Sequence, residues 1–362
     1  MREARRIRST MILWLVVVLT AVTALPVMSF AGAKVKLNKT KAVMFIGESQ
    51  TLKLKNARGK VKWTTADKRV ATVSGKGEVK AKKTGRIWIR AIKKKKEYKC
   101  RVCVYRVNAV KLENQQVGLE GVINARQLGG YRTRSGKKIK KNLIFRSGEL
   151  AGATDNDLAR LRAYHLTRVV DLRFPGDYTD CPDRKVSGAD NVLITLIKSS
   201  KDYKASAQAR CQRVYSLATQ NEQLAAAAQD GGCVGKNFYL NLAKSGYTSK
   251  QLKRWFNILA KQKKGDAVLF HCIYGKDRTG YVAYMTLVAL GVDQKTALKD
   301  FALTNEEFGR VLSKKTSAVK AAYMKTALNY IKKKYGTTRK YLNKEVGLTD
   351  SQIEKLRAMY LE

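Results

Sequence analysis

The fold is predicted from residues 265–291, which read Gly265-Asp-Ala-Val-Leu-Phe-His-Cys-Ile-Tyr-Gly-Lys-Asp-Arg-Thr-Gly-Tyr-Val-Ala-Tyr-Met-Thr-Leu-Val-Ala-Leu-Gly291. The short apolar run 267–270 predicts a buried strand. Beyond Gly280, apolar residues recur at helical spacing as far as Gly291, which is a typical helix stop. Cys272 is therefore expected between the end of a strand and the start of a helix, with Arg278 six positions further on.

This arrangement predicts a site for a phosphoryl group. The first amides of a helix lack intrahelical partners and, with the helix dipole, attract anions. Arg278 can add a bidentate guanidinium, and the same positive field favours the nucleophilic thiolate form of Cys272. A structural cysteine beside a glycine-rich turn is the alternative. The agreement of strand, glycines, Lys276, Asp277, Thr279 and following helix favours the phosphate site.

The run His271-Cys272, five residues, Arg278-Thr279 resembles the signature of the cysteine-dependent protein tyrosine phosphatase superfamily. The Gly-Lys-Asp-Arg-Thr form of the loop is similar to a bacterial tyrosine/lipid phosphatase subgroup. This resemblance implies phosphotyrosine or phosphoinositide substrates, a cysteinyl-phosphate intermediate and no metal or cofactor. It also implies roles for loop residues: Cys272 as nucleophile, Arg278 and the amides of Ile273, Tyr274, Gly275 and Lys276 as phosphate ligands, and Thr279 as support for the departing sulfur. Lys276 is expected to favour multiply phosphorylated substrates.

The region before this stretch resembles the opening of the same subgroup. Residues 121–132 and 144–150 follow a strand, glycine turn and strand pattern, with Gln127 where the subgroup usually has Asp. Arg146 is expected to bind substrate, and a structural role is the alternative. The tail 336–357 also resembles the subgroup, so the resemblance covers residues 118–362. It implies an α/β domain with a central, mostly parallel sheet and flanking helices.

Two carboxylates are candidates for the general acid that protonates the leaving oxygen. Asp171 ends an apolar strand, which places it at the same sheet edge as Cys272 if the two strands are parallel neighbours. The alternative for Asp171 is a structural role in a salt bridge with Arg173. Asp277 lies in the loop itself. The sequence favours Asp171 by a small margin.

Charge and composition restrict the partners. Lys and Arg total 73 against 28 acids, a formal net charge of +45. This balance indicates an anionic partner, which could be a nucleic acid, an anionic lipid, a cell-wall or other polyanion or a phosphorylated substrate, or simply a basic exported protein. With a phosphorylated protein or phosphoinositide as substrate, a nucleic acid partner is not expected. Only two histidines are present, so a His-based metal site is not expected.

The N-terminus has the layout of a secretory signal peptide over residues 1–33. Four arginines precede an apolar run from Met11 to Leu25, and small residues follow Pro26. Cleavage after Ala31 or Ala33 is expected, and an uncleaved membrane anchor is the alternative. Either reading predicts a secreted or cell-surface bacterial protein.

Residues 34–107 predict a small all-β sandwich, because short alternating runs are separated by turn residues at regular intervals. The runs Val61-Lys-Trp-Thr64, Val70-Ala-Thr-Val-Ser74 and Gly77-Glu-Val-Lys-Ala81 resemble the bacterial immunoglobulin-like group 2 domain. The segment holds 24 basic residues and four acids. A tether to cell-wall polyanions is one hypothesis, and simple solvation is the other. Cys100 and Cys103 should point to opposite faces of a strand, which disfavours a zinc site.

Residues 198–264 are expected to form a helical lid, with helices near 205–228 and 249–262. Any two of Cys181, Cys211 and Cys233 could form a disulfide in an exported protein. Further helices are expected over 294–303 and 317–335. The rival functions are a surface protein that recognises phosphate without turnover, and a sulfur-transfer enzyme. The loop with Arg278 and Thr279 disfavours the second.

Overall fold

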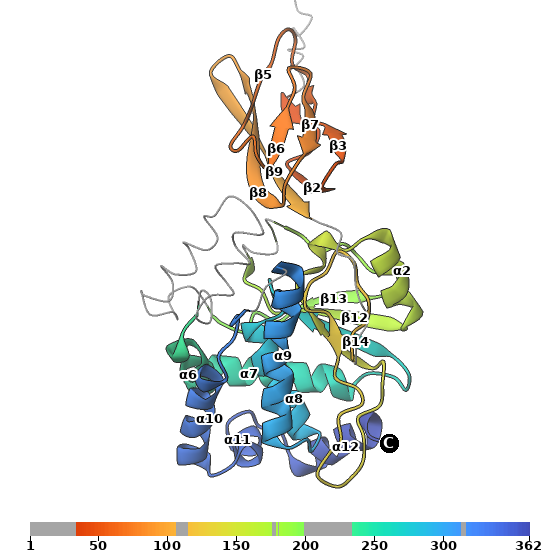
Figure 1. Ribbon diagram of the computed structural model, residues 1–362, viewed down its shortest axis with the longest axis vertical. Coiled ribbons are helices and arrows are strands. Elements are labelled where there is room, and N and C mark those ends of the chain that lie inside the picture. Colours follow the sequence, from red (N-terminus) through yellow and green to blue (C-terminus); the bar gives the residue numbers. More distant parts are fainter. Residues whose placement is uncertain (1–33, 106–114, 176–178, 180, 199–233, 313–315) are drawn as a thin grey trace, which may run out of the picture.

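The computed structural model describes residues 34–105, 115–175, 179, 181–198, 234–312 and 316–362. The expected signal peptide therefore lies outside the described residues. Within the described residues, a narrow all-β part, here called the β module (residues 34–105), stands on one end of a larger α/β domain (Figure 1). None of the helices in these ranges is long and apolar enough to span a bilayer.

The β module is a sandwich, as the alternating sequence predicts. Its larger sheet has the order β2-β9-β8-β5 and its smaller sheet the order β3-β7-β6, while β1 pairs with β4. The strand bounds are β1 Lys36–Leu37, β2 Lys41–Phe45, β3 Ser49–Thr51, β4 Leu54–Lys55, β5 Lys62–Thr65, β6 Ala71–Val73, β7 Glu78–Ala81, β8 Gly85–Lys93 and β9 Lys96–Tyr105. Leu52, Ile87, Ile89 and Val102 lie in the shared core.

The α/β domain contains a five-stranded sheet of order β10-β11-β14-β12-β13. All neighbours are parallel except β10, which runs antiparallel to β11. The strands are β10 Arg126–Gln127, β11 Ile144–Ser147, β12 Leu166–Asp171, β13 Asp190–Leu193 and β14 Ala267–His271. Strand β14 is buried at every position, as expected for a central strand covered on both faces.

Helices cover both faces of this sheet (Figure 1). Val268 and Phe270 of β14 pack into the core that contains α7, α8 and α12, whereas Leu269 packs toward α2. The helical segments are η1 Leu150–Gly152, α2 Asp155–Ala163, α6 Lys236–Lys244, α7 Gly246–Ala260, α8 Asp277–Ala289, α9 Gln294–Leu312, α10 Ala321–Tyr335, α11 Thr338–Lys344 and α12 Asp350–Tyr360. Thr154 and Thr349 cap α2 and α12 in capping boxes.

The expected lid over 198–264 needs correction in its second half. Helix α7 is part of the main core, because Leu252, Trp255 and Leu259 are fully buried there. The position of this segment between Asp171 and Cys272 suggested a lid, but the apolar face of α7 packs into the core beside β14. The first expected lid helix, near 205–228, lies outside the described residues. The helix expected over 294–303 extends as far as Leu312.

The disulfide in the described part of the chain joins two residues that the sequence did not pair. Cys103 of β9 is bonded to Cys181 of the α/β domain, so the bond links the two parts of the protein. Cys100 lies in the core of the β module with a free thiol. Cys100 and Cys103 thus face opposite sides of β9, as strand geometry predicts.

Candidate active site

The segment from β14 to α8 places Cys272 at the carboxyl edge of the sheet. Strand β14 ends at His271 and helix α8 begins at Asp277, so residues 272–276 connect them. These residues and the first two of α8, 272–278 in all, are here called the phosphate loop. In the pairing register, His271 lies opposite Ser147 of β11 and opposite Asp171 of β12. The expectation that Asp171 and Cys272 share one sheet edge is therefore confirmed.

Three carbonyl groups of the phosphate loop are held from outside. The Ile273 carbonyl accepts a hydrogen bond from the backbone amide of Glu149 at 3.0 Å. The side-chain amide of Asn124 donates to the carbonyls of Tyr274 and Gly275 at 3.1 and 2.8 Å. Arg146 also donates to the Gly275 carbonyl, at 2.8 Å. Each carbonyl thus points away from the interior of the loop.

The outward carbonyls determine the direction of the loop amides. In a planar trans peptide the N–H points opposite to the preceding C=O. The amides of Tyr274, Gly275 and Lys276 are therefore directed toward the inside of the loop. They converge beside the N-terminus of α8, where the helix dipole adds positive potential. Such a ring of amides forms a cradle for a phosphoryl group.

Cys272 and Arg278 stand at the two ends of the phosphate loop. Cys272 is a free cysteine and is buried. Arg278 lies in the first turn of α8, is mostly buried, and stacks over the Phe174 ring at 5.3 Å. Stacking on an aromatic face restricts the guanidinium to one plane, which suits bidentate contact with phosphate oxygens.

The backbone of Gly275 and the hydroxyl of Thr279 have environments that are specific to this loop. Gly275 has φ = +63°, and a Cβ at this position would lie 2.5 Å from the backbone carbonyl atoms of Ser147. Only glycine fits so close to a neighbouring strand end. The hydroxyl of Thr279 is fully buried and has no hydrogen-bond partner within the described residues. A buried hydroxyl of this kind is available to a group that occupies the site.

Arg146, expected to bind substrate or to act structurally, has contacts that fit the structural role. It is fully buried and donates to the outer side of the loop and to Asp300, at 2.5 Å. Asp300 also pairs with buried Arg126 at 3.2 Å. Burial would raise the pKa of Asp300, but the two guanidinium groups hold it below its ordinary value.

Two supporting residues were missed in the sequence. Asn124 has φ = +57° and belongs to the quoted run that opens the α/β domain, but its contact with the loop depends on tertiary folding. Asp300 lies within α9, and the sequence around it does not distinguish it from a surface residue of the helix. Gln127, which replaces the usual Asp, accepts a hydrogen bond from the Asn142 amide at 2.7 Å, so a polar contact persists there.

Asp171 forms the salt bridge that the sequence left open. Its two carboxylate oxygens accept hydrogen bonds from Nε and Nη2 of Arg173, at 2.8 to 3.0 Å. The Arg173 backbone amide adds a further bond at 2.9 Å. A carboxyl group that accepts at both oxygens can deliver a proton only after these bonds rearrange.

Asp277 has the contrasting environment. It is buried at the start of α8, accepts a hydrogen bond from the Tyr239 hydroxyl, and lies 3.5 Å from the Lys276 ammonium. Burial raises the pKa of Asp277 above its ordinary value, although Lys276, Tyr239 and Arg278 oppose this effect. Asp277 therefore remains protonated to higher pH than an exposed aspartate does. Lys276 is itself fully buried.

His271, directly before the nucleophile, belongs to a buried ionic network. Its Nε2 lies 3.0 Å from Asp183, and its Nδ1 lies 3.1 Å from the Cys272 carbonyl oxygen. Burial would lower the pKa of His271, but Asp183 and Asp171 raise it to about 9. A protonated imidazole beside the loop adds positive charge near the thiol.

Asp171, Asp183 and His271 have ligand atoms within 4.8 Å of one another, a spacing that a metal ion could bridge. However, Arg173 donates hydrogen bonds to Asp171 and to Asp183, the latter at 2.9 Å. The guanidinium thus already occupies the position between the carboxylates and supplies the compensating charge.

Comparison with known proteins gives two family matches. Residues 117–362 match the tyrosine phosphatase family, and residues 32–103 match the bacterial Ig-like domain (group 2). The chain is 25% identical over 274 residues to a Cupriavidus necator protein named as a candidate tyrosine-protein phosphatase, covering 68% of this chain and 88% of that one. It is 24% identical over 278 residues to the Mycobacterium tuberculosis triple specificity protein phosphatase PtpB, covering 67% of this chain and 98% of PtpB.

Among solved structures, P. aeruginosa TpbA matches with 16% sequence identity and a TM-score of 0.25, covering 61% of this chain and 88% of TpbA. The sequence matches and the geometry of the phosphate loop provide the basis for the function.

Proposed function

The chain belongs to the tyrosine phosphatase family and is a protein-tyrosine-phosphatase-type phosphoric monoester hydrolase, and from this premise we propose its mechanism, substrates and location. The proposal is hydrolysis of phosphomonoesters through a cysteinyl-phosphate intermediate at Cys272. The observation that carries it is the set of outward carbonyls at Ile273, Tyr274 and Gly275. These carbonyls turn the loop amides toward the inside of the loop that begins at Cys272 and ends at Arg278.

In the first step, the Cys272 thiolate attacks phosphorus and the bond between phosphorus and the leaving oxygen breaks. The loop amides and the Arg278 guanidinium hold the three other oxygens, on which charge gathers in the transition state. The leaving oxygen takes a proton from a carboxylic acid. In the second step, water attacks phosphorus, the acid residue accepts the proton of that water, and the phosphorus–sulfur bond breaks. The buried hydroxyl of Thr279 can donate to the departing sulfur.

We assign the acid role to Asp277, although the sequence favoured Asp171 slightly. Burial raises the pKa of Asp277, which keeps the residue protonated to higher pH, and Asp277 lies within the phosphate loop at the first position of α8. Both oxygens of Asp171 are bound by Arg173. Asp171 then serves as the charged partner that keeps Arg173 and His271 in place.

The proposed substrates are phosphotyrosine proteins, phosphoinositides, or both. The M. tuberculosis relative is named a triple specificity protein phosphatase, which supports a site that accepts more than one phosphomonoester. Arg278, Lys276 and the helix N-terminus all favour a dianionic phosphate. A panel containing a phosphotyrosine peptide, a phosphoinositide in vesicles and a soluble inositol phosphate distinguishes these substrates.

The proposed location is outside the bacterial cytoplasm. The layout of residues 1–33 and the Cys103–Cys181 disulfide support export, because disulfides persist in oxidising compartments. The lysines of the β module are nearly all exposed, which supports an additional contact with a cell-wall polyanion.

Turnover of p-nitrophenyl phosphate by the full-length protein tests the proposal. We expect activity that is abolished by Cys272→Ser and strongly reduced by Arg278→Lys, because lysine lacks the bidentate fork. Rapid acid quenching with a ³²P-labelled substrate should trap a phosphorylated enzyme in the parent and none in Cys272→Ser. Equal activity of Cys272→Ser and the parent would contradict the mechanism. Phosphate binding without turnover would support the recognition protein instead.

A further inference from the structure

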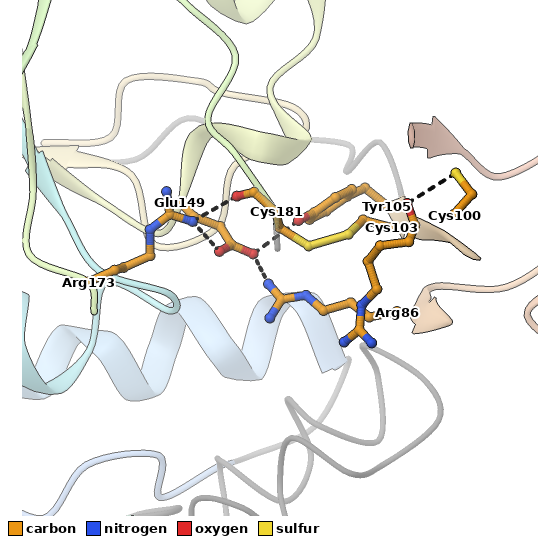
Figure 2. The surroundings of a disulfide bond; sticks show 8 residues. Arg86, Cys100, Cys103, Tyr105, Glu149, Arg173 and Cys181 are labelled. Carbon is orange, nitrogen blue, oxygen red and sulfur yellow. Dashed lines mark hydrogen bonds and ion pairs between the residues drawn. A yellow bond between two sulfur atoms is a disulfide. The ribbon is translucent and has the colours of Figure 1, made fainter. Parts of the chain in front are cut away.

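The β module and the α/β domain meet at a compact interface. Cys103 and Tyr105 of β9 pack with Ala151 and Cys181 in one buried cluster, and the disulfide lies within it (Figure 2). Gly152 is required at this point, because a Cβ there would lie 2.5 Å from the Tyr105 ring. The β module is thus packed on the segment that follows β11, whose end supports the phosphate loop, and bonded to Cys181, which follows β12 in the chain.

One buried carboxylate, Glu149, joins the two parts. Arg86 of β8 donates to Oε1 of Glu149, and the Tyr105 hydroxyl donates to the same oxygen at 3.0 Å. From the opposite side, Arg173 donates to Oε2 at 2.8 Å. Figure 2 shows Glu149 between the Arg86 and Arg173 side chains. The β module therefore supplies two of the three side chains that satisfy this carboxylate.

Glu149 also contacts the phosphate loop directly. Its backbone amide donates to the Ile273 carbonyl at 3.0 Å, one of the bonds that turn the loop amides inward. Fixing the Glu149 side chain therefore restricts the backbone that holds the loop. Without Arg86, a buried carboxylate would lose a charged partner, and its side chain would have to move or compete more strongly for Arg173.

Arg173 extends the network to the sheet edge. Besides Glu149, it binds Asp171, Asp183 and the carbonyl of disulfide-bonded Cys181, the last at 3.0 Å. Asp183 lies against His271. The charged cluster therefore consists of three carboxylates, two guanidinium groups and one imidazole: Glu149, Asp171, Asp183, Arg86, Arg173 and His271.

We propose that the β module is a working part of the phosphatase site. Arg86, held at the interface by the Cys103–Cys181 disulfide, is a positioning residue that acts through Glu149 and Arg173 on the phosphate loop and His271. The inference rests on the proposed cysteine mechanism. It assigns the immunoglobulin-like part a role in turnover, in addition to any role as a spacer or tether.

The test compares Arg86→Gln with Arg90→Gln in the full-length protein. Arg90 lies on the same strand and pairs with Glu97 at the surface, at 2.7 Å, so its loss should leave turnover unchanged. We expect Arg86→Gln to lower kcat on the order of tenfold with a much smaller change in KM, as for residues that act through packed contacts. Alkylation of Cys272 by iodoacetamide at pH 6.5, followed by mass spectrometry, should slow in parallel because a positive charge is lost. Arg86→Lys should restore part of both.

The outcomes separate this inference from the proposed function. If the parent shows no Cys272-dependent turnover, the proposed mechanism fails. If the parent is active and Arg86→Gln matches Arg90→Gln in kcat and in alkylation rate while both remain folded by circular dichroism, this inference alone is overturned. If only Arg86→Gln fails to fold, Tyr105→Phe takes its place in the test, because it removes one donor to Glu149. We expect this variant to lower kcat by a smaller factor, and a kcat equal to that of the parent would overturn the inference.

The double variant Cys103→Ser/Cys181→Ser tests the disulfide. We expect kcat to fall in the same direction as in Arg86→Gln, because the interface can then separate. The same fall should follow selective reduction of the parent, after which Cys272 remains a thiol. A double variant with the kcat of the parent would overturn the role of the disulfide in holding Arg86.

Discussion

The Tyr239 hydroxyl donates a hydrogen bond to the carboxylate of Asp277, so a residue of α6 reaches the first turn of the helix that follows Cys272. The contact therefore connects α6, which precedes β14 in the chain, to the candidate general acid Asp277. Tyr239 is fully buried, and its ring also packs edge-on against Phe301. The position of the Asp277 side chain is therefore set by the core of the domain.

The first prediction concerns the general acid. Asp277→Asn should slow hydrolysis of phenyl phosphate, a poor leaving group, by roughly 10²-fold or more. It should slow p-nitrophenyl phosphate much less, because that leaving group departs without a proton. Asp171→Asn should affect both substrates alike, since it disturbs Arg173 and His271. Steady-state kinetics with the two esters checks this. A leaving-group dependence confined to Asp171→Asn would return the acid role to Asp171.

The second prediction concerns Tyr239→Phe. The Tyr239 hydrogen bond lowers the pKa of Asp277, so its removal should raise that pKa further. An acid catalyst must be protonated, and activity falls as pH rises through its pKa. The basic limb of the kcat profile should therefore move to higher pH in Tyr239→Phe. Measurement of kcat for phenyl phosphate between pH 5 and 9 checks this, with Tyr330→Phe on the neighbouring helix α10 as a control that should keep the profile of the parent.

The sequence predicted those parts of the site that depend on local chain geometry. The strand, loop and helix around Cys272 follow from an apolar run, paired glycines and a 3.6-residue period, and all three are present. The placement of Asp171 beside His271 follows from the pairing of parallel strands. The groups that hold the loop from outside, Asn124 and Asp300, come from distant elements, and no local pattern marks them.

The link between the two parts of the protein was not predictable in the same way. Cys103 and Cys181 are separated by 78 residues, and pairing requires the β module to dock in one orientation on the α/β domain. In the sequence, nothing distinguishes Arg86 from the many other basic residues of the β module. Its partner Glu149 lies in a loop that the sequence described only as part of an opening motif. Arg86 and Glu149 come into contact only through the tertiary packing of the two parts.

The third prediction concerns stability and pH. The pKa of His271 is raised from 6.5 to about 9 by its buried carboxylate neighbours. Its stabilising contribution should therefore be complete below about pH 6.5 and lost as pH rises through 9, amounting to roughly 3 kcal/mol in the free energy of unfolding. Urea unfolding at pH 6, 7.5 and 9 checks this. Asp183→Asn should lower stability at pH 6 and flatten the decline, and an equal decline in that variant would contradict the assignment.

The fourth prediction concerns the exposed lysines of the β module. If they bind a cell-wall polyanion, retention of the full-length protein on bacterial envelopes should fall as salt rises from 0.05 to 0.5 M, because salt screens exposed charges. The substitutions Lys94→Gln and Lys95→Gln at the exposed turn between β8 and β9, combined with Lys96→Gln at the exposed start of β9, should weaken retention and leave phosphatase activity unchanged. Retention that is insensitive to salt would contradict the tether.

The fifth prediction concerns Gly275. A Cβ here would lie 2.5 Å from the Ser147 backbone, and the φ of +63° is unfavourable for alanine. The loop must then move away from β11, which misdirects the amides at Tyr274 and Gly275. A displacement of about 1 Å can cost on the order of 10²-fold in rate, so Gly275→Ala should lower kcat/KM by at least that factor and weaken inhibition by vanadate.

A matched control distinguishes crowding from backbone strain alone. Gly265 has φ = +90° in the turn before β14, and a Cβ there meets no atom within 4 Å. Gly265→Ala should therefore lower the free energy of unfolding by about 1 kcal/mol through strain, with kcat/KM and vanadate inhibition unchanged. If both alanine variants lost activity equally, the close approach of Gly275 to the end of β11 would not be what holds the loop amides in their inward direction.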